Sequence, residues 1–201
     1  MRKGIDVSEN NGRVDWDAVK AAGMDFAIVR LGYGKRHLDE RFYKNVNGAI
    51  AAGLKIGVYY YSYALDAEAA EREADFLVDT LLDCGLTSDR LPMGVWFDQE
   101  DADGYKARHG VTDGGTLTDM CGAFLEVCRE RGFGKCGVYA SYDWLENRLD
   151  ASRWGDGALI WCAQWDDGCD WDGAAIWQYT DGLEIGGRFF DGNILFDGGA
   201  L

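Results

Sequence analysis

The feature that most constrains the fold is the alternation of apolar runs with helical segments over the first two thirds of the chain. Five runs have the β-branched and aromatic composition of strands that are buried on both faces. These predicted strands are 3–7, 26–31, 55–63, 93–98 and 136–140, and the predicted helices that follow them are 15–22, 41–52, 67–82, 117–131 and 142–148. Strands that alternate with helices in this way predict parallel βαβ units.

The last third of the chain continues with strands but without helices. Three further apolar runs, 159–163, 175–179 and 188–191, are separated only by loop-like segments. Five units and three closing strands make eight, which is the number of strands in a closed α/β barrel of the TIM type. The 201 residues include a single proline and no Ser/Gly-rich linker, so we predict one domain over residues 1–201.

Two carboxylates stand at the end of the fourth predicted strand. Asp98 and Glu100 have one residue between them, and alternate residues of a strand point to the same side. Their Cα atoms would lie about 6–7 Å apart, given a rise of about 3.3 Å per residue. Paired carboxylates at such a strand end fit glycoside hydrolysis. The alternative is a solvated strand end that is acidic because the whole chain is acidic.

The carboxyl ends of all the predicted strands carry polar and aromatic side chains, and in such a barrel these ends form the site. Acids and amides hydrogen-bond sugar hydroxyls, and aromatic faces stack on sugar rings, so this composition predicts a carbohydrate site. The candidate residues are Asp6, Arg30, Tyr59, Tyr61, Asp98, Glu100, Tyr139, Gln164, Trp165, Gln178, Tyr179 and Asp191.

Some side chains near these ends have a structural explanation instead. Arg30 is alternatively expected to form an ion pair with one of the acids at the strand ends. Tyr60 alternates away from Tyr59 and is expected to pack outside the site. Trp96 and Trp161 lie in mid-strand and are expected in the core, whereas acids such as Asp15 and Asp39 are expected to cap helices or to lie in their first turns.

The net charge restricts the partners. Lys and Arg number 20 against 35 Asp and Glu, which gives −15. Binding to nucleic acid needs cationic contacts to phosphate, so this charge argues against nucleic acid, and it also argues against an anionic membrane surface. The sequence contains no run of 18 apolar residues, so membrane insertion is not predicted. The first residues do not resemble a secretory signal. We expect a soluble monomer with a neutral or weakly charged substrate.

Metal and cofactor motifs are also missing from the sequence. The six cysteines include no C-x-x-C pair and no Cys/His cluster of the kind that binds zinc. Cys121 and Cys128 are too far apart on one predicted helix to form a disulfide. We therefore expect free, buried thiols, no metal and no cofactor. His37 and His109, the only histidines, lie in polar segments, and a catalytic Ser-His or Cys-His pair is not expected.

Several short segments spread over the whole chain resemble one enzyme family, the family 25 glycoside hydrolases, which are lysozymes of the Chalaropsis type. The segments that carry the resemblance are Gly4-Ile5-Asp6-Val7-Ser8, Val14-Asp15-Trp16, Arg30-Leu31-Gly32-Tyr33-Gly34, Gly57-Val58-Tyr59-Tyr60-Tyr61-Ser62-Tyr63, Asp98-Gln99-Glu100, Trp177-Gln178-Tyr179-Thr180 and Asp191-Gly192-Asn193. Asn11 and Gln164-Trp165 depart from the family pattern, and we expect these departures to affect sugar subsites.

The resemblance implies a (β/α)5(β)3 barrel that hydrolyses the β-1,4 bond after N-acetylmuramic acid in bacterial peptidoglycan. It implies Glu100 as general acid and Asp6, Asp98 and Asp191 as supporting carboxylates. The role of Asp98 remains open. It could be a nucleophile, a base for water or a group that stabilises the substrate's own N-acetyl group during attack. The resemblance also implies action at the bacterial wall, as a phage endolysin or an autolysin that reaches the wall without a signal peptide.

Two other functions remain open at this stage. One is a sugar-binding barrel that has lost catalysis, and the other is a hydrolase of another N-acetylglucosamine polymer such as chitin. The intact set of four acids argues against the first alternative. The short acidic run before Glu100 argues against the second. A charge of −15 further predicts that activity on an anionic wall depends on salt.

Overall fold

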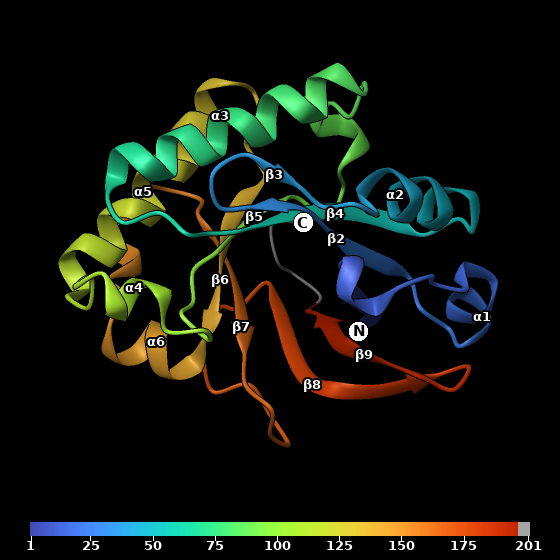
Figure 1. The fold of residues 1–201 in the computed structure, drawn as a ribbon. Helices are drawn as coiled ribbons and strands as arrows, with labels where there is room; N and C mark the ends of the chain where they lie inside the picture. The colour runs from blue at the N-terminus through green and yellow to red at the C-terminus, as the bar shows by residue number, and fades with distance from the viewer. Residues whose placement is uncertain (197–201) are drawn as a thin grey trace.

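A computed structural model describes residues 1–196 and shows one closed barrel of eight strands (Figure 1). The barrel closes because β1 pairs with β2 on one side and with β9 on the other, which confirms the predicted fold class. The barrel strands are β1 (Arg2–Val7), β2 (Phe26–Tyr33), β4 (Lys55–Tyr61), β5 (Val95–Asp98), β6 (Cys136–Ser141), β7 (Leu159–Ala163), β8 (Ile176–Ile185) and β9 (Arg188–Leu195). The short β3 (His37–Leu38) extends β2 as a hairpin.

The five predicted helices cover the outside of the barrel, and the β8–β9 side has no helix in front of it (Figure 1). They are α1 (Trp16–Ala21), α2 (Phe42–Ala51), α3 (Ala67–Asp83), α5 (Gly114–Glu130) and α6 (Tyr142–Asn147), with 3-10 turns at Glu9–Asn11, Ser88–Arg90 and Ala151–Arg153. Side-chain oxygens of Asp15, Asp66, Asp113 and Ser141 accept backbone N–H groups at the first turns. These caps fix where the helices begin.

The segment 101–115, which lies between the predicted strand 93–98 and the predicted helix 117–131, contains a helix. Here α4 (Tyr105–Arg108) forms one turn, and α5 already begins at Gly114. The carboxylate of Asp101 explains the extra turn, because its two oxygens accept the N–H groups of Lys106 at 2.7 Å and Ala107 at 2.9 Å. The capping residue lies four positions before the helix begins, and the sequence of the segment shows no helical pattern of its own.

The closing strands also differ from the prediction. β9 runs antiparallel to both β8 and β1, whereas we had placed Asp191 at the carboxyl end of its strand. Gly186 and Gly187, with φ of 59° and 76°, form a tight turn that reverses the chain. β9 therefore enters the barrel from the end where the other strands finish. Asp191 reaches that end from mid-strand, directly opposite Asp6.

Two apolar layers follow from the alternation of side chains along each strand. Phe26, Ile28, Trp96 and Trp161 fill the barrel, and the two indoles meet edge to face at 5.7 Å. The other face of each strand packs under the helices. Tyr60 lies there against Phe76 and donates its hydroxyl to a backbone oxygen. Both predictions, buried tryptophans and an outward Tyr60, are confirmed.

Three further observations concern the thiols, the helices and possible metal ligands. All six cysteines are free, as expected. Four are buried as well, whereas Cys84 is exposed and Cys169 is partly exposed. Across residues 1–196, no helix is long and apolar enough to cross a membrane. In the same part of the chain, no group of three or more His, Cys, Asp or Glu side chains is arranged to hold a metal ion.

Candidate active site

A pocket of about 230 Å³ opens where the parallel strands end. It gathers nine of the twelve candidate residues and four residues that were not on that list, although Asn11 was expected to affect a sugar subsite. The predicted ones are Asp6, Arg30, Tyr59, Tyr61, Asp98, Glu100, Tyr139, Gln178 and Asp191, and the others are Ser8, Asn10, Asn11 and Trp161.

The strands build this pocket by a change of side-chain type along their inner face. In β2 the inward side chains are Phe26, Ile28 and then Arg30, and in β5 they are Trp96 and then Asp98. The apolar members close the barrel floor, and the last member of each series is polar. Because every second residue of a strand faces inward, apolar side chains fill the barrel interior and polar side chains line the pocket above them.

Asp98 and Glu100 form the first acid pair of the pocket. Asp98 is only 4% exposed, and its Oδ1 has no hydrogen-bond partner among the described residues. Burial, followed by the charge of Glu100, raises the pKa of Asp98 well above its usual value. Burial also raises the pKa of Glu100. Like charges this close disfavour double ionisation, so the pair keeps a proton at pH values where exposed carboxyl groups have lost theirs.

Asp6 and Asp191 form the second acid pair across the β1–β9 ladder. Asp6 Oδ2 accepts hydrogen bonds from Gln178 Nε2 at 3.0 Å and from Asn193 Nδ2 at 2.8 Å. Burial, and then the charge of Asp191, raise the pKa of Asp6 well above its usual value, and burial raises that of Asp191. Asn193 was not among the candidate residues. Its position two residues after Asp191 on a strand was the signal that could have identified it.

Lys106 is a second residue that the sequence reasoning missed. It is 1% exposed, and its Nζ donates to the backbone oxygens of Ser62 at 2.6 Å and Glu100 at 2.8 Å. Burial lowers the pKa of Lys106, and the charge of Asp98 opposes this effect. The lysine lies outside every predicted strand and helix, in a polar segment where a lysine is normally solvated. Nothing in the local sequence marks it as buried.

Aromatic side chains form the walls between the two acid pairs. Tyr139 donates its hydroxyl to Gln178 Oε1 at 3.0 Å, and Trp161 donates to Asn193 Oδ1 at 2.8 Å. Burial raises the pKa of both Tyr59 and Tyr139 well above the usual value. The phenols therefore stay protonated and present a polar edge on an apolar ring, which suits contacts with a sugar.

Arg30 lines the pocket but forms a structural ion pair, with a partner we did not predict. Its Nε contacts Asp39 Oδ2 at 2.9 Å, and its Nη2 lies 3.2 Å from Glu9. Asp39 is buried and also accepts the N–H groups of Glu9 and Arg41. The expectation that an acid at the strand ends would pair with Arg30 is wrong, because the β2–β3 hairpin brings Asp39 back to it.

Three predicted binding residues do not line the pocket. Tyr179 follows the inward Gln178, so its ring points to the outer face beside Trp177, at 5.8 Å. Gln164 is turned away and donates to Asp170 at 2.6 Å. Trp165 is 61% exposed and touches the site only through an indole N–H bond of 3.2 Å to Gln178 Oε1. Gln178 and Tyr179 are adjacent strand residues, so only one of the two faces the pocket.

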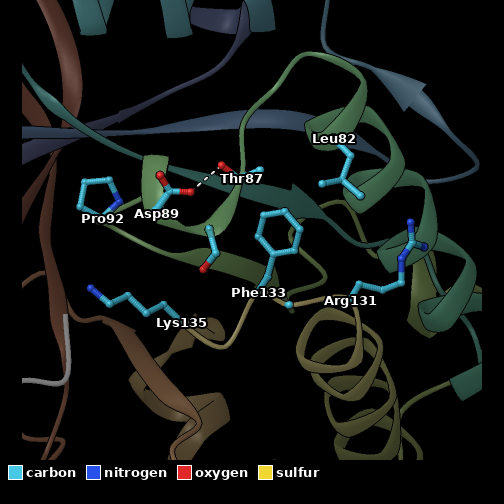
Figure 2. Close-up of a pocket in the computed structure, with 9 residues that line it drawn as sticks. Leu82, Thr87, Asp89, Pro92, Arg131, Phe133 and Lys135 are labelled. Atoms are coloured by element: carbon cyan, nitrogen blue, oxygen red, sulfur yellow. Dashed lines mark hydrogen bonds between the residues drawn. The ribbon is translucent and has the colours of Figure 1, made fainter.

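A larger hollow of about 600 Å³ lies at the opposite end of the barrel. Figure 2 shows Pro92 and Lys135, which directly precede β5 and β6, together with Arg131 and Phe133. Thr87 and Asp89 form a hydrogen bond with each other there. Asp89 is the only carboxylate of its lining, so this hollow has no acid pair, and we assign the candidate active site to the smaller pocket.

Known proteins resemble this chain in sequence and in fold. Lysozyme M1 of Streptomyces globisporus is 36% identical over 74 residues, which are 37% of this chain and 25% of that protein. The autolytic lysozyme of Clostridium acetobutylicum is 34% identical over 102 residues, 48% of this chain and 31% of that protein. The matches thus cover less than a third of these relatives.

A solved structure shows the same fold over nearly the whole chain. The modular autolysin LytC from Streptococcus pneumoniae, solved in complex with a synthetic peptidoglycan ligand, has a TM-score of 0.82 and 23% identity. The likeness covers 97% of this chain and 46% of LytC. The sequence model of the glycosyl hydrolases family 25 matches residues 5–188. The chain therefore belongs to glycosyl hydrolases family 25.

Proposed function

We propose that this protein is a lysozyme, an N-acetylmuramidase that hydrolyses the β-1,4 bond between N-acetylmuramic acid and N-acetylglucosamine in bacterial peptidoglycan. The observation that carries the proposal is the proton-holding pair Asp98 and Glu100 in a pocket walled by aromatic rings. Membership of family 25 and the lysozyme names of the two sequence relatives support it.

In this proposal Glu100 is the general acid. It is more exposed than Asp98, so it is the member of the pair that a glycosidic oxygen can approach. Burial raises its pKa, and a raised pKa lets a carboxyl group keep its proton to higher pH for use as a general acid. As the bond between C1 and the leaving oxygen breaks, Glu100 transfers its proton to that oxygen.

Asp98 then assists the substrate's own N-acetyl group. Its Oδ1 has no partner among the described residues and is available to accept the N–H of that group. The acetamido oxygen would attack C1 as the glycosidic bond breaks. Water would then open the cyclic intermediate and return a proton to Glu100. Asp6 and Asp191 would support the positive charge that develops on the sugar ring.

The proposal also covers the setting in which the enzyme acts. We assign the whole chain, residues 1–201, to one catalytic domain that works as a monomer on the bacterial wall, outside the cytoplasm. Peptidoglycan is the partner, and nucleic acid and membrane insertion play no part. The substrate-binding residues are those of the pocket walls, Arg30, Tyr59, Tyr61, Tyr139 and Gln178, with Trp165 at the edge.

The test is release of reducing ends from peptidoglycan that has been stripped of teichoic acid. Wild-type protein should release ends that carry muramic acid, and Glu100→Gln should be slower by about 100-fold or more, the range for a lost general acid. Glu126→Gln, which changes an exposed glutamate on α5, is the matched control and should retain full activity. Equal rates for wild type and Glu100→Gln, or N-acetylglucosamine at the new ends, would contradict the proposal.

A further inference from the structure

A second pocket of about 470 Å³ adjoins the candidate active site. Tyr61 lines the active-site pocket, and its ring lies 5.2 Å from that of Tyr63, which lines the second pocket. Tyr63 in turn meets Tyr105 edge to face at 4.9 Å. A continuous aromatic surface therefore leads from one pocket to the other. We call the second one the side pocket.

The side pocket has more cations than acids in its lining, although the protein has a net charge of −15. The cations are Lys35, Arg36 and Arg72, and the acids are Asp66 and Glu73. Arg72 has an exposed ion pair with Glu68, and the guanidinium of Arg36 lies over the ring of Phe76. Within residues 1–196, Lys35 makes no ion pair with a carboxylate closer than 4 Å. Lys35 and Arg36 are therefore available to an anion, whereas Arg72 is already paired with Glu68.

The backbone at this pocket is strained. Arg36 has a φ of 63°, and it is the only non-glycine residue in the described part of the chain with a positive φ. A side chain in this region of φ is disfavoured, and such strain clusters at functional sites. The strained turn places Lys35 and Arg36 in the lining of the side pocket, next to Gly34.

Glu73 supplies an independent indication of a ligand. It is 5% exposed and lines the side pocket. Its Oε1 accepts the N–H of Tyr63 at 3.0 Å, whereas its Oε2 is buried without a hydrogen-bond partner in the described structure. Burial raises the pKa of Glu73 to about 7. In its protonated form, Oε2 has a hydrogen bond to donate to a ligand oxygen.

We propose that the side pocket binds the carboxylate-bearing peptide substituent of the peptidoglycan strand while the sugar occupies the active site. This inference rests on the proposed function. Four carboxylates in the active-site pocket repel an anionic substituent, so its charges must be held elsewhere. The side pocket lies next to the sugar site and offers the cations Lys35 and Arg36. Its volume is in the range of pockets that enclose a small ligand. It exceeds the space that a single carboxylate needs.

The test compares two forms of the same glycan strand, both free of teichoic acid. One form keeps its peptides, and the other is stripped by an amidase so that only the lactyl carboxylate remains. The variant combines Lys35→Ala with Arg36→Gly, since glycine accepts the positive φ at position 36. We expect kcat/KM on peptide-bearing strands to fall about tenfold or more, with stripped strands changed less than about twofold. High salt should reduce the difference.

Controls separate this inference from general charge effects and from the proposed function. Lys135→Ala, in the hollow of Figure 2 at the far end of the barrel, also removes a cation and should leave both rates unchanged. Equal loss on both strand forms, or no loss on either, would overturn the inference. A loss that appears only on walls that still carry teichoic acid would do the same, because it would indicate a phosphate site. Failure of the wild type to cleave either form would instead overturn the proposed function, and the inference with it.

Discussion

The ammonium of Lys106 donates a hydrogen bond of 2.8 Å to the backbone oxygen of Glu100. A second bond, to the backbone oxygen of Ser62 at 2.6 Å, ties the same ammonium to the chain just beyond β4. The buried lysine thus fixes the segment that carries the proposed acid. Its charge also acts on the acid pair, because it lowers the pKa values of Asp98 and Glu100 against the effect of burial.

The variant Lys106→Met should therefore change both the rate and the pH profile. We expect kcat to fall about tenfold or more, because the backbone of Glu100 loses its anchor and small misplacements strongly reduce catalysis. The cation's loss should also raise the pKa values of the acid pair, so that the alkaline limb of kcat/KM against pH moves to higher pH. A full pH profile measures both effects.

The matched control for this prediction is Lys44→Met, which removes an exposed lysine on α2. It should leave the profile of the wild type unchanged. If Lys106→Met lowered the rate but left the alkaline limb in place, Lys106 would have only a structural role.

Glu73 should make the protein less stable as the pH rises. Its pKa is about 7 in the folded protein against 4.5 for an ordinary glutamate, so folding favours the protonated form. This contribution is fully present below pH 4.5 and is lost as the pH rises through about 7. Its size is about 3 kcal/mol, from about 1.4 kcal/mol for each pKa unit.

Urea unfolding at several pH values from 4 to 8 tests this sign. The free energy of unfolding of the wild type should fall over this range, and Glu73→Gln should remove much of the fall. Glu71→Gln, on the exposed face of the same helix, should behave as the wild type does. Parallel pH curves for Glu73→Gln and the wild type would show that burial of Glu73 does not couple folding to pH.

The ion pair of Arg30 with Asp39 should contribute strongly to stability. Asp39→Asn leaves the Arg30 guanidinium, which is buried, without its main charge partner, and breaking a buried pair costs about 3–5 kcal/mol. Asp119→Asn is the control, because Asp119 pairs with Arg153 at the exposed surface, where a pair contributes about 0–1 kcal/mol. Chemical denaturation measures both. Similar small losses would mean that the buried pair is no stronger than the exposed one.

Local sequence patterns predicted the barrel and most of the polar side chains that gather at the ends of its strands. Alternation of strands with helices predicted the barrel, and the period of two along β5 correctly placed Trp96 inside and Asp98 at the site. What failed depends on contacts between distant segments. The burial of Lys106 requires Ser62 as an acceptor, and the direction of β9 depends on a glycine turn and on pairing with β1. The burial of Lys106 leaves no local pattern in the sequence, whereas the Gly186-Gly187 pair is a local turn signal that the strand prediction did not use.

Gly137 provides a final test of how the barrel interior supports the site. It lies opposite Trp96 in the β5–β6 ladder, and a Cβ there would meet the backbone oxygen of Leu159 and come within 2.6 Å of the Trp96 ring. Trp96 contacts Trp161, which lines the active-site pocket. Gly137→Ala should therefore destabilise the fold by about 1–3 kcal/mol, as overpacking does, and should also reduce activity. Gly134→Ala, where a Cβ meets no atom within 4 Å, should do neither. Thermal unfolding and wall hydrolysis are measured on both variants. Equal melting temperatures and equal rates for the two would show that the fold and the activity do not need the space beside Trp96.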